Sequence, residues 1–383
     1  MKTLFRKILL IICVCLSLLS RTYAESKIKV GLIVPLSGEY SAIGESIIKS
    51  TRLALNKIND DRFEIVPEDT KANPIETLKV SKKLYDQGIK IIIGPVFNKS
   101  TKYLDDLNDV TFISFTNKIY GNPSNVISAG VNAISQLQTI DRFRNFNDIQ
   151  RSIILIPRSD YRKEIEQAIK KTKFKFKDKF FYDLDPTLLT AQIEKITRYP
   201  QRKENLLNEI ERVENSSLIN KDKKLEDLKK KDTLGGINFD SVIIADFGES
   251  LKSVATSLLY TDISSKRISY ITLNQWFDNS LLKETSLQPV YFPSINKENF
   301  EVFKIEYNKA YKKKANQLSF LSYDLVGLVY FLIYSNNFNQ DKKIFYEKNK
   351  FKGKIGIFEI DKNTITHQLN FYSINDEKFI KIF

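Results

Sequence analysis

Hydroxyl and amide side chains gather at three points where a predicted strand gives way to a predicted helix. The free backbone N–H groups and the partial positive charge at a helix start favour an anionic group, and Ser or Thr hydroxyls can add hydrogen bonds to it. The same residue types are ordinary helix caps, which better explains any one turn taken alone. Because the carboxyl ends of parallel strands meet at one sheet edge, three such turns together predict a ligand site. The candidate ligand-binding residues are Ser37 in the first turn, Asn98 and Ser100 in the second, and Ser114 and Thr116 in the third.

Catalytic constellations are scarce by comparison. His367 is the only histidine of the chain, so a Ser-His-Asp triad would depend on this residue and a zinc site would lack its usual companions. The stretch from Gly38 to Gly44 has neither the lysine of a phosphate-binding loop nor the spacing of a dinucleotide-binding loop. No pair of carboxylates stands out from the rest. The sequence therefore predicts a non-catalytic protein with no metal site and no cofactor.

The first 24 residues predict export. A basic start precedes the apolar run Ile8–Leu19, which leads to the small-x-small triplet Thr22-Tyr23-Ala24. This order is typical of a secretory signal peptide, and the run is short for a bilayer span, which leaves a short membrane anchor as the alternative. Cys13 and Cys15 follow an isoleucine and a valine, whereas lipoprotein processing needs a small residue there. We expect a signal peptide at 1–24 and a periplasmic location.

Cysteine content and charge narrow the class further. Both cysteines lie in the predicted signal peptide, so the mature chain would form no disulfide and no thiolate metal site, which is typical of a bacterial exported protein of this length. The chain has 60 basic and 46 acidic residues, a formal net charge of +14. The lysines are spread along the chain among acids, and export separates the protein from nucleic acid. A nucleic-acid partner is therefore not expected.

Short apolar runs alternate with longer amphipathic stretches from residue 28 onwards. Ile28–Val34 predicts a buried strand and 43–59 a helix, and the alternation continues to residue 114 before a second set begins near residue 128. Such alternation predicts parallel sheets covered by helices on both faces, here two in succession. The other predicted strands are 63–66, 89–93, 111–114, 153–156, 174–182, 241–245 and 268–272, with helices at 76–85, 100–107, 161–170, from about 187, and at 250–260.

Two segments break this alternation. Helices are predicted at 296–314 and 319–334, and an antiparallel meander follows with strands at 353–360, 364–372 and 378–382, which indicates a chain that crosses between lobes more than once. Residues 200–232 hold nine basic and eight acidic side chains, with apolar positions at helical spacing on either side of a break at 215–217. They predict a charged helical hairpin inserted in the second lobe, either a solvated excursion or a docking arm for a protein partner.

Several of these segments resemble a known family. Val30 to Gly38, with Gly44, resembles the opening of the type I periplasmic binding proteins, and in particular of the leucine/isoleucine/valine-binding family. Ile91–Pro95 resembles the third strand and ligand loop of that family, and Ser152–Pro157 with Tyr161 resembles the strand and tyrosine turn that open its second lobe. Later matches are Leu321–Asp324, the helix that returns to the first lobe, and Phe351–Phe358, the closing strands.

The resemblance implies two Rossmann-like lobes, joined by three hinge strands, that close over a small solute. The first-lobe ligand contacts of the family map to the candidates already named in the second and third turns, and its second-lobe aromatic maps to Tyr161. The family places a carboxylate against the ammonium group of the ligand, in a late second-lobe loop that here reads Leu273–Trp276 and contains no acid. Asn274 in that loop is a candidate contact, and Asp246, after the preceding strand, is the candidate for holding a cation.

A second branch of the same fold shares some of these features. The charged insert before Thr233–Gly235 and the segment Leu273–Phe277 resemble chains classed as penicillin-binding protein activators, which stimulate a cell-wall synthase. Members studied as activators are outer-membrane lipoproteins, and no lipidation cysteine is predicted here.

The sequence thus predicts a periplasmic solute-binding protein that captures a small, polar, amino-acid-like ligand between two lobes for an inner-membrane ABC transporter. The alternative is an envelope protein, similar to the penicillin-binding protein activators, that acts on a cell-wall synthase through protein–protein contacts. The expected domains are a signal peptide at 1–24, a first lobe at 27–130 plus 293–345, a second lobe at 131–292 plus 346–383, and the hairpin at 200–232 within the second lobe.

Overall fold

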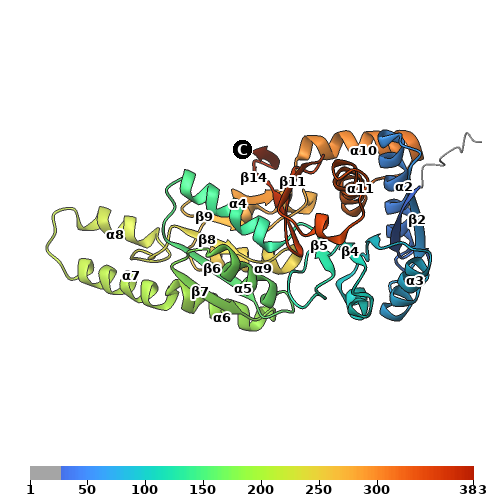
Figure 1. Cartoon of the computed structure of the whole chain (residues 1–383). Helices are drawn as coiled ribbons and strands as arrows, with labels where there is room; N and C mark the ends of the chain where they lie inside the picture. Colours follow the sequence, from blue (N-terminus) through green and yellow to red (C-terminus); the bar gives the residue numbers. More distant parts are fainter. Residues whose placement is uncertain (1–26) are drawn as a thin grey trace, which may run out of the picture.

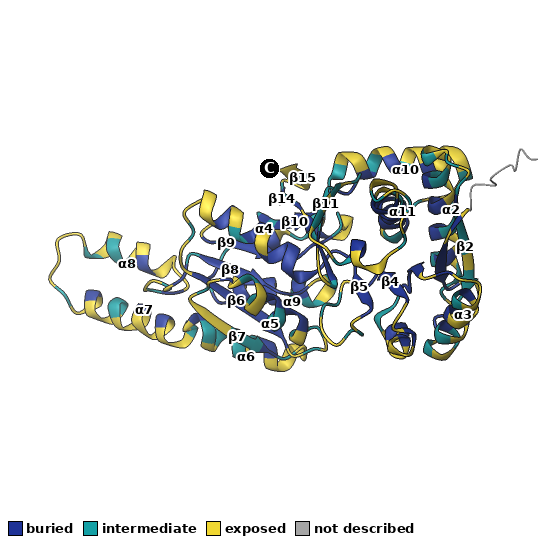
Figure 2. Ribbon diagram, in the orientation of Figure 1, coloured by how far each residue is buried: buried dark blue, intermediate teal, exposed yellow. Residues whose placement is uncertain are grey.

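The computed structural model describes residues 27–383, which form two α/β lobes lying side by side (Figure 1). The predicted signal peptide at 1–24 lies outside the described residues. Each lobe is one sheet with helices on both faces, because its central strands are buried on both sides and its helices on one (Figure 2). The prediction of two open α/β sheets is confirmed.

The first sheet has eight strands in the order β11-β12-β13-β5-β4-β3-β1-β2. Strands β1 to β5 are parallel to their neighbours, β13 continues the sheet in parallel beside β5, and β11 to β13 form an antiparallel edge. The strand bounds are β1 Ile28–Val34, β2 Phe63–Asp69, β3 Ile91–Ile93, β4 Thr111–Ser114, β5 Val126–Ser128, β11 Asn349–Lys352, β12 Ile357–Asp361 and β13 Thr364–Gln368.

Two groups of helices cover this sheet. One face carries α2 (Ser41–Ile58), α10 (Lys297–Tyr311) and α11 (Gln317–Ser335), and the other carries α3 (Pro74–Asp86). The helix predicted at 100–107 is instead two short 3-10 helices, η1 (Asn98–Thr101) and η2 (Leu104–Leu107). Asn, Ser and Asp residues in this stretch have low helix propensity, which disfavours a longer helix.

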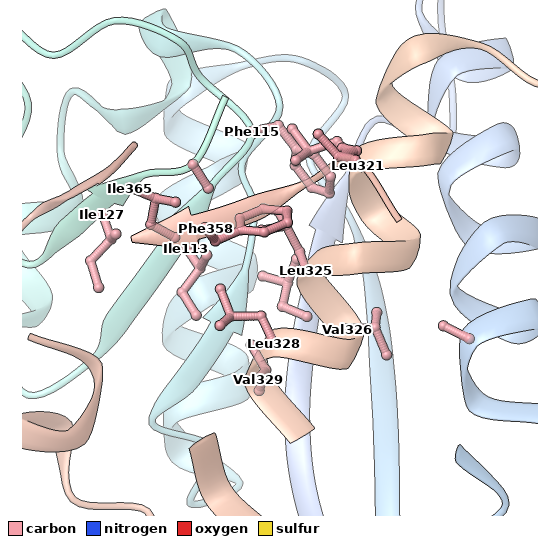
Figure 3. Packing of buried hydrophobic residues seen from close by; sticks show 14 of the residues in the cluster. Ile113, Phe115, Ile127, Leu321, Leu325, Val326, Leu328, Val329, Phe358 and Ile365 are labelled. Atoms are coloured by element: carbon pink, nitrogen blue, oxygen red, sulfur yellow. The ribbon is translucent and has the colours of Figure 1, made fainter. Parts of the chain in front are cut away.

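The core of the first lobe is built around α11. Leu321, Leu325 and Leu328 of this helix pack against Ile113 and Ile127 of the central strands, and Phe358 of β12 closes the same cluster (Figure 3). Within residues 27–383, α11 is the one helix long and apolar enough to cross a membrane, with a mean hydropathy of 1.5, but 61% of that window is buried inside the lobe. Its apolarity is accounted for by burial in the core.

The second sheet has seven strands in the order β15-β14-β10-β9-β8-β6-β7. Helices α4 (Ala133–Phe146) and α5 (Arg162–Thr172) cover one face, and α6 (Pro186–Thr197) and α9 (Gly248–Tyr260) cover the other. The remaining bounds are β6 Ser152–Pro157, β7 Asp178–Tyr182, β8 Ser241–Ile244, β9 Ser269–Thr272, β10 Val290–Ser294, β14 Asn370–Asn375 and β15 Lys378–Lys381, with short 3-10 helices η3 Asn279–Lys283, η4 Thr285–Leu287 and η5 Lys342–Phe345.

The chain crosses between the lobes three times, after β5, after β10 and after β13. The last crossing differs from the sequence prediction, which read 364–372 as one strand and assigned all of 346–383 to the second lobe. Residues 364–368 pair with β12 and β5 in the first sheet, whereas 370–375 pair with β10 in the second. An alternating pattern predicts a strand but not the sheet that the strand joins. The pattern continues through the crossing without a break, so two strands in different sheets were predicted as one.

Hydrogen bonds tie the first crossing to the third. The Asn132 side chain donates to the carbonyl of Ile365 at 2.7 Å, and the His367 Nε2 lies 2.8 Å from the carbonyl of Ala129. Burial lowers the pKa of His367 to about 4. The one histidine of the chain therefore lies buried at the hinge, where it bonds backbone.

The segment predicted as a charged hairpin contains α7 (Tyr199–Glu214) and α8 (Lys221–Lys229), which project from the second lobe on the side away from the first (Figure 1). Leu206, Val213 and Leu228 form a small apolar cluster between the two helices, and the outer faces are exposed (Figure 2). Arg202 is buried at the base, where its guanidinium donates to the Thr197 carbonyl at 3.1 Å and to the Thr233 hydroxyl at 3.0 Å. The arm is thus anchored at its base.

Candidate functional site

A cleft of about 740 Å³ lies between the two lobes. Asn117, after β4, and Gln317, at the start of α11, come from the first lobe, and most of the lining comes from the loops that follow β6, β8 and β9 in the second. Its volume is within the range of small-molecule sites, about 300–1,000 Å³. The lining is Asn117, Val131, Gln136, Tyr161, Phe247, Gly248, Leu273 to Asn279 and Gln317.

Aromatic side chains form much of the second-lobe wall. Tyr161 and Phe247 meet edge to face with ring centroids 6.1 Å apart, and Phe247 is 54% exposed. Burial raises the pKa of Tyr161, and the nearby carboxylate of Glu164 raises it further, so the hydroxyl stays protonated. Trp276 and Phe277 follow β9 with φ angles of 45° and 58°, in the left-handed region that side chains rarely adopt. Such backbone costs about 1–3 kcal/mol per residue and gathers at binding sites.

Asn274 places an unsatisfied donor in this wall. Its Oδ1 accepts from the Ser294 hydroxyl at 2.8 Å and from the Trp276 backbone N–H at 3.0 Å. Its Nδ2 is buried and has no hydrogen-bond partner among residues 27–383, although the side chain lines the cleft and the residue is only 9% exposed. Buried polar groups in native proteins are almost always paired. Among the residues that line the cleft, Asn274 is therefore the candidate hydrogen-bond donor.

The start of α9 adds backbone donors beside it. Phe247 occupies the N-cap position and contributes no side-chain cap, and Gly248, the first helical residue, lines the cleft. The first N–H groups of a helix have no intrahelical partner and carry the positive end of the helix dipole. Together with Asn274, this helix start makes the second-lobe wall a donor surface suited to a carboxylate or an amide carbonyl.

Asp246, the predicted holder of a cation, is engaged inside the second lobe. Its carboxylate accepts from the Tyr182 hydroxyl at 2.5 Å, from the Phe247 backbone N–H at 2.8 Å and from the Ser250 hydroxyl. It is buried and does not line the cleft. Burial, and then the Asp246 charge, raise the pKa of Tyr182. The geometry argues against the predicted role, because both carboxylate oxygens already serve the α9 turn.

The first predicted turn, at Ser37, is also engaged. The Ser37 hydroxyl donates to the carboxylate of Asp69 at 2.5 Å, and the Leu36 backbone N–H donates to the other oxygen at 2.8 Å. Burial acts to raise the pKa of Asp69, but hydrogen bonds from Ser37 and from the Lys71 and Leu36 backbone lower it below the ordinary value. The donors of this turn, which were expected to bind an anionic ligand, therefore bind the carboxylate of Asp69.

The other first-lobe candidates are mostly satisfied by their neighbours. Buried Ser114 donates to the Pro95 carbonyl at 2.8 Å and accepts from the Thr116 backbone N–H at 3.2 Å, and the Thr116 hydroxyl accepts from the Lys118 N–H at 3.2 Å. Asn98 donates to the Asn122 side chain at 2.7 Å and borders a separate hollow of about 580 Å³. The exception is Ser100, whose buried hydroxyl has no partner in the described chain.

Residues 117–122, which we call the strap, lie between β4 and β5 of the first lobe and contact the second lobe. Glu164 of α5 accepts from the Ile119 backbone N–H at 2.7 Å and from the Tyr120 N–H at 3.2 Å. It is 3% exposed, and Ile119 packs on the second-lobe core. Burial raises the pKa of Glu164, while the two N–H groups act to lower it. The strap thus bridges the lobes with the chain's own backbone.

Of the eight predicted site residues, the structure brings Tyr161 and Asn274 into the cleft, and leaves the other six outside its lining. The predicted site residues did not include Gln136, Phe247 and Gln317 of the lining, or Glu164 beneath the strap. Phe247 and Gln317 begin helices directly after loops, which is a usable signal, whereas Gln136 and Glu164 lie inside helices and carry none. Within residues 27–383 there is no cluster of three or more His, Cys, Asp or Glu side chains suited to a metal.

Residues 27–198 match the sequence model of the family described as periplasmic binding protein. A curated relative, the Leu/Ile/Val-binding protein of Citrobacter freundii, is 29% identical over 107 residues, which cover 26% of this chain and 29% of that protein. The chain therefore aligns with less than a third of the length of this relative.

Solved structures match over nearly the whole described chain. The C-domain of LpoA from Haemophilus influenzae, described as a regulator of PBP1A, is 14% identical with a TM-score of 0.62 over 93% of this chain and 100% of that chain. LivJ from Streptococcus pneumoniae, in complex with isoleucine, is 17% identical with a TM-score of 0.54 over 93% and 100%. A solute-binding protein from Rhodopseudomonas palustris, in complex with 3,4-dihydroxybenzoic acid, is 15% identical with a TM-score of 0.54 over 94% and 96%.

At these sequence identities, the similarity to solved structures shows the fold alone. The fold is shared with a protein solved in complex with isoleucine and with a protein described as a regulator of PBP1A. The chain therefore has the two-lobed fold of the type I periplasmic binding proteins, with sequence similarity to the leucine/isoleucine/valine-binding proteins and structural similarity to LpoA.

Proposed function

We propose that this protein is a periplasmic solute-binding protein that captures one small polar ligand between its lobes for delivery to an ABC transporter. The observation that carries the proposal is the unpaired, buried Asn274 amide in a cleft of about 740 Å³ lined from both lobes. Ligand contact with both walls would favour the closed arrangement over the open one, which is how such a protein couples capture to closure.

The lining favours one ligand chemistry. Asn274 and the α9 start supply donors, and Tyr161, Phe247 and Trp276 supply flat apolar surface. Asp278 is the one acid in the lining, and its side chain already caps η3 by accepting from the Ser280 N–H at 2.9 Å. We expect a small carboxylate or amide with a planar or apolar body. An α-ammonium group has no free buried carboxylate to meet in this cleft.

A ligand screen on the refolded protein tests the proposal. Thermal unfolding would be followed in the presence of amino acids, small peptides, aliphatic and aromatic carboxylates, and cell-wall fragments. A ligand at about 100 times its Kd stabilises the folded state by about 2.7 kcal/mol, which raises the melting temperature visibly. Small carboxylates should give the strongest shifts, and a screen without any hit would contradict the proposal.

A matched pair of variants ties any hit to the cleft. Asn274→Asp keeps the acceptor oxygen used by Ser294 and Trp276 but replaces the unpaired donor by a negative charge. We expect it to lose carboxylate binding. Asn279→Asp adds the same charge at an exposed position of the same lining and should keep most of the affinity. Equal binding by both variants would show that Asn274 does not contact the ligand.

A second candidate function is regulation of a cell-wall synthase, as in penicillin-binding protein activators. The similarity to the LpoA C-domain over its whole length favours it, and the projecting α7–α8 arm supplies an exposed contact surface. Replacing residues 203–231 by a short Gly-Ser link keeps the Arg202 anchor and removes the arm. If the protein regulates a synthase through this arm, the variant should no longer stimulate glycan polymerisation by a purified synthase. If the protein only binds a solute, the variant should give the same thermal-shift hits as the parent.

A further inference from the structure

A second hollow, larger than the cleft, runs along the outer side of the first lobe. It has a volume of about 1,130 Å³ and is bordered by α10, by the turn between α10 and α11, and by Ile43 of α2. That volume exceeds the range of about 300–1,000 Å³ usual for small-molecule sites, so a larger partner fits it better than a solute does. We call it the α10 groove. Gln317 lines both the groove and the cleft, so the groove reaches the mouth of the cleft.

The floor of the α10 groove is apolar. Ile305 is 69% exposed, Phe300 lies deeper at the junction with the core, and Ile43, Ala315 and Leu318 complete the surface. A scattered exposed apolar residue needs no explanation, but an apolar floor inside a hollow marks an interaction surface. The groove therefore offers burial to apolar side chains of a partner.

The rim of the groove is basic. Lys309, Lys312 and Lys314 line it, and none of them has an ion-pair partner within the described part of the chain. Their neighbours differ, because Lys304 pairs with Glu301 at 2.8 Å and Lys313 pairs with Glu45 at 3.0 Å. Uncompensated positive charge around an apolar floor is complementary to a segment with acidic and apolar faces. Such complementarity speeds association and selects partners.

We infer that the α10 groove docks an acidic amphipathic helix of a partner protein, with the apolar face on Ile305 and the acids toward Lys309, Lys312 and Lys314. Helices bind grooves of this kind through anchors at i, i+3, i+4 and i+7 spacing. Because Gln317 lines both the groove and the cleft, a docked helix would lie next to the cleft. The inference does not rest on the proposed solute function, since it uses no cleft residue other than Gln317.

A synthetic peptide serves as the probe. A fluorescein-labelled helix of about four turns would carry Leu at i, i+3, i+4 and i+7 positions and Glu on the opposite face. Its anisotropy should rise on titration with the protein, and the affinity should fall as salt is added, because exposed charges are screened. A scrambled peptide with the same composition and a peptide with Lys in place of Glu are the probe controls. If either control binds as tightly as the probe, the inference is overturned.

Charge reversal locates the binding surface. Lys309→Glu, Lys312→Glu and Lys314→Glu, made together, should weaken the acidic probe about tenfold or more, as three rim charges change sign. The same triple variant should gain affinity for the Lys peptide. The matched control reverses Lys170, Lys171 and Lys173, three exposed lysines at the end of α5 in the second lobe, and it should bind the acidic probe as the parent does. Equal loss in both triple variants would overturn the docking site.

Two further outcomes decide between occupants. In one outcome, vesicles of anionic phosphatidylglycerol sediment the parent but not the groove variant, and the peptide does not bind. This result would overturn the inference and identify the groove as a lipid-binding surface. Self-association of the parent that is lost in the groove variant, with no binding of the peptide, would replace the inference by a second copy of the chain. Ile305→Ser is a separate check of the floor. It removes one apolar anchor without altering charge, and the acidic probe should bind it about tenfold more weakly, because burial of one isoleucine side chain is lost.

Discussion

The two lobes differ in what the polar groups at the ends of their strands do. On the first-lobe side the hydroxyls of Ser37 and Ser114 are bound to other groups of the same lobe. On the second-lobe side Asn274 keeps an unpaired amide, and the α9 start lacks a side-chain cap. Both groups of residues lie at the carboxyl ends of parallel strands, the edge where ligands bind in this class of fold. The edge alone therefore does not decide which residues bind a ligand.

The difference indicates a division of labour between the lobes. A ligand that binds a paired polar group must break an existing hydrogen bond, whereas a ligand that binds an unpaired donor adds a hydrogen bond. Under the proposed function, the second lobe would therefore select the ligand. The first lobe contributes the strap, Asn117 and Gln317, and its inward hydroxyls hold the loops in shape. Variants on the two sides should separate ligand affinity from stability and closure.

The largest effect is expected at the strap. Glu164→Ala leaves the Ile119 and Tyr120 N–H groups without their acceptor, and hydrogen bonds to a charged group contribute about 1.5–3 kcal/mol each. The lobes should then sample wider separations, which spin labels placed on α3 and α6 would report as a longer and broader distance distribution. Glu166→Ala on the same helix removes only surface ion pairs and serves as the control. Unchanged distances in Glu164→Ala would mean that the strap does not hold the lobes together.

The next effect concerns stability and not binding. Ser114→Ala removes one donor to the Pro95 carbonyl and one acceptor for the Thr116 N–H inside the first lobe. Loss of a buried partner costs about 1–3 kcal/mol, so the free energy of unfolding should fall by that order. Affinity for any solute found in the screen should be nearly unchanged, measured at a temperature where the variant is folded. A large loss of affinity with normal stability would return Ser114 to the ligand site.

The strand pattern was the most predictable part of the molecule. Ile28–Val34 forms β1 with the predicted bounds, and the predicted strand 153–156 lies within β6. Strands buried on both faces have continuous apolar runs, so they can be recognised from the sequence. Residues 364–372 were misread because β13 and β14 follow each other with one residue between them. The sheet that each strand joins depends on partners far away in the sequence.

The candidate site was less predictable for the same reason. Tyr161 and Asn274 reach the cleft, and both were named from the family resemblance. Ser37 has the residue type and position of a ligand contact, but it bonds Asp69, which lies 32 residues away. Local sequence shows which side chains can donate a hydrogen bond, and only the packed structure shows which donors remain free. Asn274 keeps an unpaired donor, whereas the Ser114 hydroxyl is bonded to the Pro95 carbonyl.

The pH should modulate the strap with a definite sign. Burial raises the pKa of Glu164 above its ordinary value in the docked strap, so the docked state binds the proton more tightly than an undocked state would. Docking is then most favourable below the ordinary value of 4.5 and weakens as the pH rises through the raised pKa. Distance distributions at pH 4.5 and 7.5 should show narrower separations at the lower pH. Glu164→Gln should abolish the difference, and a parent that closes further at high pH would refute the assignment.

The smallest effect is expected at Ser37, which lies in the first lobe outside the cleft lining. Ser37→Ala removes one exposed hydrogen bond to Asp69, while the Leu36 and Lys71 backbone N–H groups continue to hold that carboxylate. The free energy of unfolding should fall by no more than about 1 kcal/mol, the loss expected for a single hydrogen bond. The melting temperature should therefore change little. Isothermal titration with a solute from the screen should give an unchanged Kd. A rise of tenfold or more in Kd would show that Ser37 trades Asp69 for the ligand, and the two lobes would then be alike.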